Sequence, residues 1–393
     1  MIERESPLAG CVVLDLSRAL AGPHAGMVLG DLGARVIKVE SRGGDETRSW
    51  GPPFVGPDGD VSTYFLSCNR NKESIALDLK DSEDISILHD LVRKADILVE
   101  NFRPGVMDRL GLGSVALAEL NPRMIVLSIT GFGHDGPEGG RPGYDQIIQG
   151  EAGLMSLTGS GPEDPQRVGV PIADLLAGLY GTIGVLAALR DREVTGKGRV
   201  VRTSLLAAVV GVHAFQGTRW TVAGEVGRAQ GNHHPSIAPY GLFRCKDGAV
   251  QISLGNDSLW RRFCDQFSLD PEAEGLGENA ERVRNRARII EIVEEAFSSY
   301  ESEELLGILS TAGVPAGRVR TLDEVYSWDQ VHAQNLVLDV DHPVLGEIQL
   351  PGPALRFFAA DEGQEVEITD HEAHKAPPLL DADRDAILEW LGR

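Results

Sequence analysis

An aspartate opens an otherwise uncharged helical segment in the stretch VGVPIADLLAG, residues 168–178. Asp174 follows Pro171, a residue favoured in the first helical turn, and the chain then carries no charge until Arg190. The dipole and the free N–H groups of a helix start stabilise a carboxylate without any catalytic purpose. The alternative is chemical, because a carboxylate with no Lys or Arg beside it in sequence is suited to nucleophilic attack on an acyl carbon.

Small residues favour the chemical interpretation. Ala177, Gly178 and Gly181 follow within two helical turns and lie on or near the same side as Asp174. Their lack of bulk leaves room for a ligand or a partner backbone to approach the carboxylate. We therefore treat Asp174 as a candidate nucleophile.

A second candidate site is the stretch VENFRPGVMDRLGLG, residues 99–113, where a predicted strand runs into Asn101, Phe102 and two arginines, Arg103 and Arg109. An aromatic face stacks on a nucleotide base, and guanidinium groups form charge-assisted hydrogen bonds with phosphate. A polar loop before a solvated helix accounts for the same residues. Both interpretations stay open on physical grounds alone.

The third candidate is the first strand-to-helix turn, AGPHAG, in which Gly22, Pro23 and Gly26 open a helix. Its N–H groups are able to hold phosphate, and Glu40 ends the next predicted strand where dinucleotide folds keep a ribose carboxylate. The GxGxxG fingerprint is absent, so we expect no NAD. Packing between helix and strand explains the spacing equally well.

Alternating elements must position these residues. The segment CVVLDLSRALAGPHAGMVLGDLGARVIKVE reads as strand, turn, small-residue helix and strand. The alternation continues through residues 66–130, which predicts an α/β fold with a mostly parallel, doubly wound sheet. A glycine-rich stretch, residues 131–145, predicts a long loop at the carboxyl end of a strand. A helix over 171–189 and a second over 204–223 follow.

The sequence pattern changes after the stretch AGEVGRAQGNHHP, residues 223–235. A hairpin is predicted in YGLFRCKDGAVQISLG, followed by three helices, which together indicate a smaller α+β domain. LVLDVDHPVLGEIQL reads as a later hairpin and RDAILEW as a terminal helix. We therefore expect the small domain over 227–320, after a helical linker over 201–226.

Composition excludes several classes of function. The net charge of −22 argues against binding to nucleic acid. The N-terminus has no apolar signal core, and the longest uncharged run is too short to span a bilayer, so we expect a cytoplasmic protein without membrane contact. The cysteines form no CxxC, and the pairs His233–His234 and His371–His374 lack a full ligand set. We expect reduced thiols and no metal.

Five ordered segments together resemble the class III CoA-transferases, the CaiB/BaiF family, over essentially the whole chain: LAGPHAGMVLGDLGARVIKVE, VENFRPGVMDRLGLG, GYDQIIQGEAGLMSLTG, VGVPIADLLAGLYG and GNHHPSIAPYGLFRCKDG. The resemblance implies a large Rossmann-like domain that holds both termini, over 1–200 and, after the smaller inserted domain, again over 321–393. It also implies two chains interlocked as a homodimer. The chain departs from the family pattern at Arg202, in VRTSL, and at LLDADRD near its end.

The resemblance also implies roles for individual residues. Asp174 corresponds to the aspartate nucleophile of the family. Asn101, Phe102 and Arg109 correspond to its CoA-contacting segment. Tyr144 and Asp145 correspond to residues beside the reacting thioester. The argument from the end of the second strand adds Glu40 to the expected contacts with CoA.

The implied reaction moves CoA from an acyl-CoA donor, such as succinyl-CoA or formyl-CoA, to a free carboxylic acid. Asp174 would form a mixed anhydride with the acyl group and then an aspartyl-CoA thioester. Water must be excluded, which we expect from residues 131–143 or Gly255–Asp257, and N–H groups at the helix start are candidates to stabilise the oxyanion. The acceptor acid stays open, with Arg141, Arg167 and His233 as candidate carboxylate-binding residues.

Two alternatives remain. The α-methylacyl-CoA racemases share this fold but need an acid/base pair; Tyr144 stands where their motif has histidine and is too weak a base, although His134 lies nearby. A non-catalytic acyl-CoA binding protein is the other alternative. It gives no reason to keep an unpaired carboxylate in an apolar helix.

Overall fold

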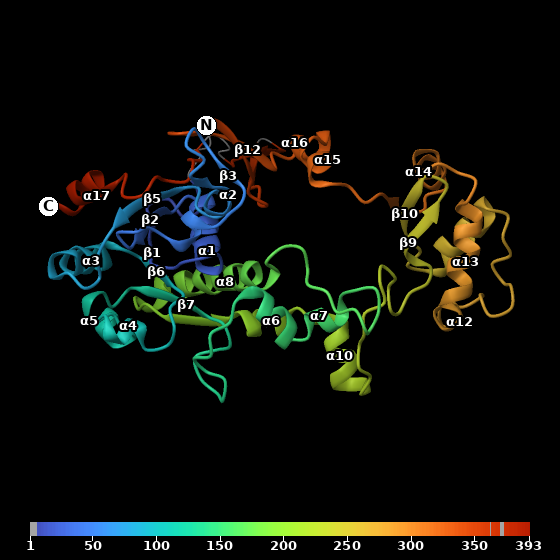
Figure 1. Cartoon of the computed structure of the whole chain (residues 1–393), viewed down its shortest axis with the longest axis horizontal. Helices are drawn as coiled ribbons and strands as arrows, with labels where there is room; N and C mark the ends of the chain where they lie inside the picture. Colours follow the sequence, from blue (N-terminus) through green and yellow to red (C-terminus); the bar gives the residue numbers. More distant parts are fainter. Residues whose placement is uncertain (1–5, 362, 370–372) are drawn as a thin grey trace. The chain divides into compact units, whose positions relative to one another are not determined.

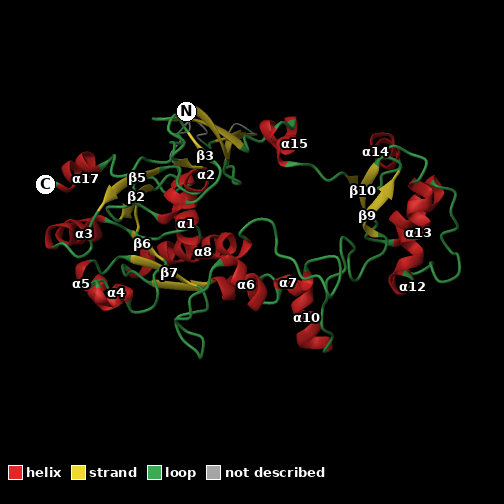
Figure 2. Cartoon of the chain, in the orientation of Figure 1, coloured by secondary structure: helices red, strands yellow, loops and turns green. Residues whose placement is uncertain are grey.

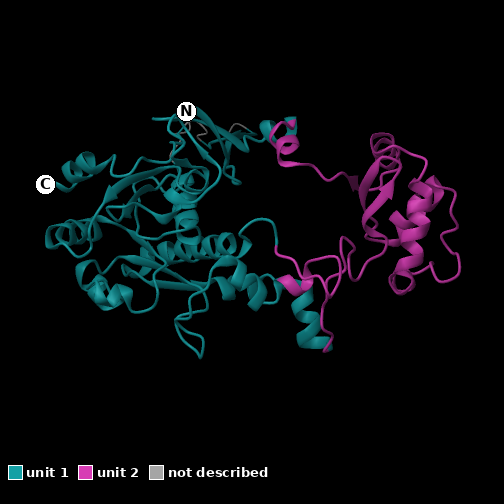
Figure 3. Cartoon of the chain, viewed as in Figure 1, with its two compact units in different colours: residues 1–154, 168–223, 329–393 teal, residues 155–167, 224–328 magenta. Residues whose placement is uncertain are grey.

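Figure 1 shows the computed structural model of the chain, which describes residues 6–361, 363–369 and 373–393. Residues 1–5 and His371, which enter the expectations about a signal segment and a metal site, lie outside the described residues. The chain divides into two units (Figure 3). Unit 1 comprises Met1–Leu154, Val168–Ala223 and Asp329–Arg393, and unit 2 comprises Met155–Arg167 and Gly224–Trp328.

A six-stranded parallel sheet forms the centre of unit 1 (Figure 2). Its order is β5 (Lys72–Ala76), β2 (Arg35–Glu40), β1 (Val12–Asp15), β6 (Ile97–Glu100), β7 (Ile125–Thr130), β8 (Val200–Ser204). Every neighbouring pair is parallel. This is the strand order of dinucleotide-binding folds, in which the winding reverses between β1 and β6. The predicted α/β class with a parallel sheet is confirmed.

Successive strand residues point to opposite faces and supply two cores. Val13 and Leu127 pack on one face against α1 (Ala21–Asp31), α6 (Asp145–Glu151), α8 (Ile172–Thr195) and α9 (Leu205–Gly211). Leu14 and Val126 pack on the other against α3 (Ser82–Lys94), α5 (Ser114–Leu120) and α17 (Arg384–Leu391). Helices therefore cover both faces of the sheet. Because all of its strands are parallel, their carboxyl ends lie along one edge.

Helix α8 extends beyond its predicted end at residue 189 to Thr195, where Gly196 stops it in a left-handed conformation (φ 69°). Its small residues serve packing. A Cβ on Gly178 would lie 2.7 Å from the carbonyl oxygen of Ala21, and one on Gly181 would lie 2.9 Å from the Leu127 side chain. Of the two occupants expected for this side of the helix, a neighbouring backbone is the one present. By length and composition alone α8 would suffice to cross a membrane, as the single such helix in the described residues.

The expected linker over 201–226 is wrong at its N-terminal end. Residues 200–204 form the last strand of the sheet, and Leu205, Ala208 and Val209 of α9 are part of the core. The mixed polar and apolar stretch VVRTS obscured an edge strand that buries one face. The helix expected over 204–223 is broken, since α10 (Ala214–Ala223) starts after Ala214 adopts φ 47°.

Unit 2 confirms the predicted hairpin. β9 (Tyr240–Cys245) pairs antiparallel with β10 (Gly248–Ser253), and short β11 (Ala316–Gly317) joins β10. Phe243, Trp260 and Phe297 belong to its apolar core. Its helices are α11 (Asp257–Gln266), α12 (Asn279–Arg284), α13 (Arg286–Phe297), α14 (Ser302–Thr311) and α15 (Leu322–Tyr326).

The remaining elements of the large unit are short. They include the predicted late hairpin of β12 (Val337–His342) with β13 (Gly346–Pro351). The others are η1 (Glu46–Ser49), β3 (Phe54–Val55), β4 (Val61–Ser62), α2 (Thr63–Leu66), α4 (Val106–Arg109), α16 (Asp329–Ala333), β14 (Phe358–Asp361) and β15 (Gln364–Glu367), while α7 (Leu154–Leu157) begins at the border of the two units.

Candidate active site

Asp174 lies in the first turn of α8, directly after the fully buried Ala173. Burial raises the pKa of its carboxyl from 3.8 to about 7, and the charge of Asp145 raises it further in the same direction. Within the described part of the chain, neither a cation nor a hydrogen-bond donor offsets these effects. The carboxylate is thus an uncompensated, partly shielded group with a pKa at working pH.

Asp145 caps the helix that carries this carboxylate. Pro171, at the N-cap position of α8, makes no side-chain capping bond. Instead the N–H of Ala173 donates to Asp145 Oδ1 at 2.8 Å, from the first turn of α6. The N–H of Ile172 donates to the carbonyl of Val170 at 2.8 Å. Two N–H groups expected to be free for an oxyanion are therefore already used within the protein.

Tyr64 interacts electrostatically with the carboxylate and was missed by sequence reasoning. Burial raises the pKa of the Tyr64 hydroxyl, and the charge of Asp174 raises it further, which places this phenol in the electrostatic field of the carboxylate. The Trp50 ring stands edge-on to Tyr64, with centroids 5.0 Å apart. Neither residue lies in a periodic pattern, so the sequence carries no signal for them. Tyr144, which was predicted here, is 63% exposed.

His24 of α1 lies against the first half of α8, beside Gly178. A Cβ on Gly178, one turn after Asp174, would lie 3.1 Å from His24 Cδ2. Burial lowers the pKa of His24 to about 4, and the neighbouring Arg70 and Lys72 contribute. The ring is therefore neutral at physiological pH and adds no cation to this side of the helix.

The reversal point of the sheet brings the second candidate site together. Asn101, after β6, joins the loop after β1: its Oδ1 accepts from Arg18 N–H at 2.8 Å, and its Nδ2 donates to Arg18 O at 2.7 Å. The Arg18 guanidinium lies over the Phe102 ring, 4.9 Å from its centroid. Arg109, at the end of α4, is exposed beside this loop. Ligands of doubly wound sheets bind at such a point.

Two buried lysines hold the loop after β1 in place. Lys72 Nζ contacts Asp15 Oδ2 and the Pro23 carbonyl, each at 2.8 Å. Lys38 Nζ contacts Asp45 Oδ2 at 2.8 Å and the carbonyl oxygen immediately before Arg18 at 3.0 Å. Buried charges persist only when paired and hydrogen-bonded. The position of Arg18 is consequently set by the strands beneath it.

Glu40 is engaged within the protein. Arg48 forms an ion pair with it at 2.6 Å, Ser74 Oγ donates to it at 2.7 Å, and Asp45 N–H donates at 2.8 Å. Both carboxylate oxygens thus have partners, and holding the segment after β2 accounts for the residue without a ligand. Its expected contact with CoA stays a prediction.

A series of hydrogen-bonded polar side chains lies at the carboxyl ends of β6 and β7. Ser128 Oγ is hydrogen-bonded to the buried Glu100 and to His134 Nε2, the latter at 2.7 Å. Glu100 also accepts from Phe102 N–H at 2.9 Å. These residues and the exposed Arg202 line a cavity of about 190 Å³. His134, the base that the racemase alternative requires, is therefore tied to a strand end.

The predicted closing loops have internal contacts. Gly131 and Gly143 meet at the base of the glycine-rich loop, where a Cβ on Gly131 would lie 2.8 Å from Gly143 N. Arg141 forms an ion pair with Glu151 at 2.7 Å. In unit 2, Asn256 caps α11 through Leu259 N–H at 2.9 Å.

Arg141 belongs to unit 1, whereas the other two candidate residues for binding the acceptor carboxylate, Arg167 and His233, belong to unit 2. The His233 ring packs edge-on to Phe243 with centroids 5.3 Å apart.

Comparison with known proteins decides between the alternatives. The sequence model of CoA-transferase family III matches residues 8–383. This chain belongs to CoA-transferase family III. Human succinyl-CoA:glutarate CoA-transferase is 39% identical over 392 residues, covering 98% of this chain and 89% of that protein. An acetyl-CoA:oxalate CoA-transferase from Acetobacter aceti is 38% identical, covering 95% of this chain and 93% of the relative.

A solved structure agrees with this assignment. The crystal structure of a CaiB/BaiF family protein from Brucella suis matches this CoA-transferase with a TM-score of 0.85 at 37% identity, covering 98% of this chain and 99% of that one. The resemblance stated from the five sequence segments is confirmed. The family III chain is an enzyme that transfers CoA between acyl-CoA and acids.

Proposed function

We propose that this CoA-transferase moves CoA from succinyl-CoA to a short dicarboxylic acid, with Asp174 as the nucleophile. The observation that carries the proposal is the carboxylate of Asp174, uncompensated at a helix start with a pKa of about 7. The substrate class is supported by relatives 38–39% identical over nearly the whole chain whose names give succinate, glutarate or oxalate as the acid.

The proposed reaction uses Asp174 twice. Its carboxylate attacks the thioester carbonyl and the C–S bond breaks. The CoA thiolate is released, and a mixed anhydride between Asp174 and the donor acyl group remains. The thiolate then attacks the aspartyl carbonyl, releasing the donor acid as a carboxylate and forming an aspartyl-CoA thioester. The acceptor carboxylate reverses the two steps, so that CoA passes to the acceptor and Asp174 is regenerated. Each intermediate, first the mixed anhydride and then the aspartyl-CoA thioester, is an activated acyl group, so the energy of the thioester is retained until CoA reaches the acceptor.

The environment of Asp174 suits this sequence of steps. Because a more basic carboxylate is a stronger nucleophile, burial that raises the pKa to about 7 increases its reactivity while keeping about half of it ionised at neutral pH. Partial shielding from water also protects the anhydride and the thioester against hydrolysis. Tyr64, with Trp50 packed edge-on against it, lies within electrostatic range of the reacting group.

We place CoA at the reversal point of the sheet. Phe102 with the overlying Arg18 offers a stacking platform for the adenine, and Arg109 offers an exposed guanidinium for phosphate. Asn101 supports the platform by joining its two loops rather than by needing a ligand of its own.

The enzyme is further proposed to be a homodimer, with α8 as part of the interface. Leu179, Tyr180, Ile183 and Leu186 are exposed along this helix, and Leu179 also lines a cavity of about 1060 Å³. A contiguous apolar surface of this kind marks an interaction site. An Ile183→Glu variant should shift the protein from dimer to monomer in light scattering; an unchanged mass would remove α8 from the interface.

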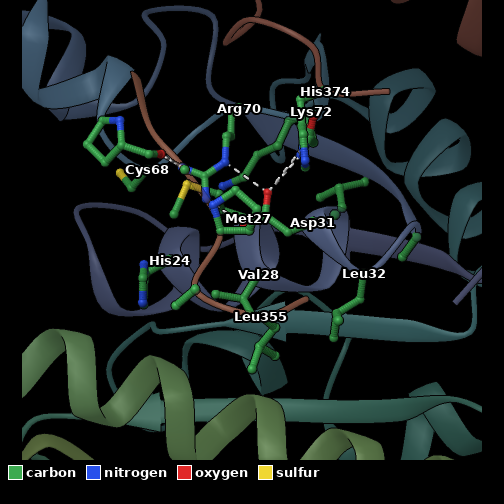
Figure 4. A pocket seen from close by; sticks show the side chains of 18 of the residues that line it. His24, Met27, Val28, Asp31, Leu32, Cys68, Arg70, Lys72, Leu355 and His374 are labelled. Carbon is green, nitrogen blue, oxygen red and sulfur yellow. Dashed lines mark hydrogen bonds and ion pairs between the residues drawn. The ribbon is translucent and has the colours of Figure 1, made fainter. Parts of the chain in front are cut away.

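The same cavity is lined by α1 and the C-terminal segment. Figure 4 shows Val28 of α1 and Leu32, which caps the end of that helix, with Leu355. It also shows the ion pair between Arg70 and Asp31, at 2.5 Å.

The substrate proposal is tested with purified protein, succinyl-CoA and a panel of free acids. We expect new acyl-CoA products from glutarate and other short dicarboxylates and little from monocarboxylates. Products from aromatic or monocarboxylic acids alone would overturn the substrate class. Exchange of the α-hydrogen of a 2-methylacyl-CoA with deuterated water, without transfer, would instead favour the racemase alternative.

A further inference from the structure

The segment that precedes Asp174, residues 168–173, is held at both ends by hydrogen bonds to side chains of one short helix. Val168 is the residue at which the chain returns to unit 1, six residues before the nucleophile. Its N–H donates to Gln149 Oε1 at 2.9 Å, and the N–H of Ala173 donates to Asp145 Oδ1 at 2.8 Å. Both acceptors belong to α6.

The two acceptors are joined to each other. Gln149 Nε2 donates to Asp145 Oδ2 at 2.7 Å, one turn apart on α6. Gln149 is fully buried at 0% exposure, which is unusual for a glutamine and is explained by the use of both ends of its amide. A side-chain amide offers a donor to a carboxylate and, from a separate atom, an acceptor to a backbone N–H.

This chain of hydrogen bonds controls the entry to α8. One carboxylate oxygen of Asp145 accepts from Ala173 N–H, and the other accepts from Gln149 Nε2. The bond from Gln149 therefore fixes the rotation of the carboxylate that caps α8 at Ala173. Since Pro171 provides no side-chain cap, the first turn of α8 has no alternative side-chain acceptor for Ala173 among the described residues. A displacement of Gln149 would therefore move the residue next to Asp174.

We propose that Gln149 is a positioning residue for CoA transfer, which relays between Val168 and Asp145 and thereby fixes the orientation of Asp174. The inference rests on the proposed role of Asp174 as nucleophile. Gln149 itself touches no substrate; it acts through the carboxylate that caps α8. The consequence is a defect in the chemical step with little change in the binding of CoA, whose proposed platform lies at Phe102.

The first test replaces Gln149 by methionine, which keeps its length and removes both hydrogen bonds. Misplacement of a reacting group typically costs about 10- to 100-fold in rate, so we expect kcat for succinyl-CoA and glutarate to fall by about that factor. KM for succinyl-CoA should stay within about threefold, because uniform binding is untouched. Gln146→Met, on the exposed side of the same helix, is the matched control and should retain wild-type kcat.

A second test reverses the polarity of the relay. Asp145→Asn alone sets an amide N–H against the Gln149 donor. In the double variant Asp145→Asn with Gln149→Glu, the carboxylate introduced at position 149 accepts from the amide introduced at position 145 and from the Val168 N–H, so every bond has a partner again. We expect the double variant to have at least about 10-fold higher kcat than Asp145→Asn alone.

The outcomes separate this inference from the proposed function. Wild-type kcat in Gln149→Met would overturn the inference, and so would a folded double variant no more active than Asp145→Asn. If Gln149→Met fails to fold, the double variant still decides. Equal turnover by wild type and Asp174→Ala would instead remove the nucleophile assignment itself, whereas loss of turnover in Asp174→Ala leaves only the role of Gln149 in question.

Discussion

Replacing the proposed nucleophile should make the protein more stable at alkaline pH while abolishing its activity. The substitution Asp174→Asn nearly preserves the shape of the side chain but removes its ability to ionise. The pKa of Asp174 is raised from 3.8 to about 7 in the folded chain, so the folded state keeps a proton that the unfolded state releases between pH 4 and 7. Stability therefore falls as pH rises through that window, and the cost is complete above pH 7.

The size of this cost follows from the pKa. One pKa unit corresponds to about 1.4 kcal/mol, which sets an upper limit of about 4 kcal/mol, and residual solvent contact of the carboxylate reduces the expected value to about 2–4 kcal/mol. For a protein of this length the gain corresponds to a rise in Tm of about 2–5 °C for Asp174→Asn at pH 8. At pH 4.5 the folded chain is protonated at Asp174 while the unfolded chain is already mostly ionised there, so a difference of about 1 kcal/mol remains, about a quarter of the upper limit.

Thermal unfolding of wild type and Asp174→Asn at pH 4.5, 6, 7 and 8 measures the effect. A Tm difference that grows with pH and levels off above pH 7 is the expected result. Equal Tm values at pH 8 would refute the burial of an ionised carboxylate, and a gain independent of pH would assign it to packing.

Three further predictions concern activity and packing. The profile of kcat/KM against pH should fall on the acid side with a midpoint near 7, and Asp145→Asn should move that midpoint to lower pH because a negative neighbour is lost; a flat profile from pH 5 to 8 contradicts this. Arg109→Ala should raise KM for succinyl-CoA about 10-fold with the order of acceptor acids unchanged, whereas a new acceptor order in the panel assay would misplace the arginine. Gly178→Ala should cost about 1–3 kcal/mol in urea unfolding, since its Cβ would lie 2.7 Å from a carbonyl oxygen, while Gly307→Ala, with open space around its Cβ within helix α14, should be neutral or stabilising.

The parallel sheet was predictable because its signals are local. The apolar runs VVLD and RVIKVE each predict a strand, and the turn before Pro23 separates the first of them from a helix. The contacts of the folded chain agree with these local preferences. The strand at 200–204 was not predictable in this way, since it buries only part of its surface at the sheet edge. Its register is set by pairing with β7, a contact between segments about seventy residues apart.

The candidate site was predictable only in part. Asp174 could be identified because a charged residue in an otherwise apolar helical segment is recognisable from the sequence alone. Gln149 and Tyr64 did not, because their roles depend on hydrogen bonds and fields from other elements. Sequence spacing likewise gave Gly178 two possible neighbours, and only the contact with α1 distinguished them.

Trapping the covalent intermediate tests the central claim most directly. Wild-type protein is incubated with succinyl-CoA in the absence of acceptor, quenched, and digested for peptide mass spectrometry. The account predicts a CoA adduct on the peptide that contains Asp174, discharged on addition of glutarate and absent from Asp174→Asn. An adduct on another carboxylate, or rapid transfer with no adduct under the same quench, would contradict it.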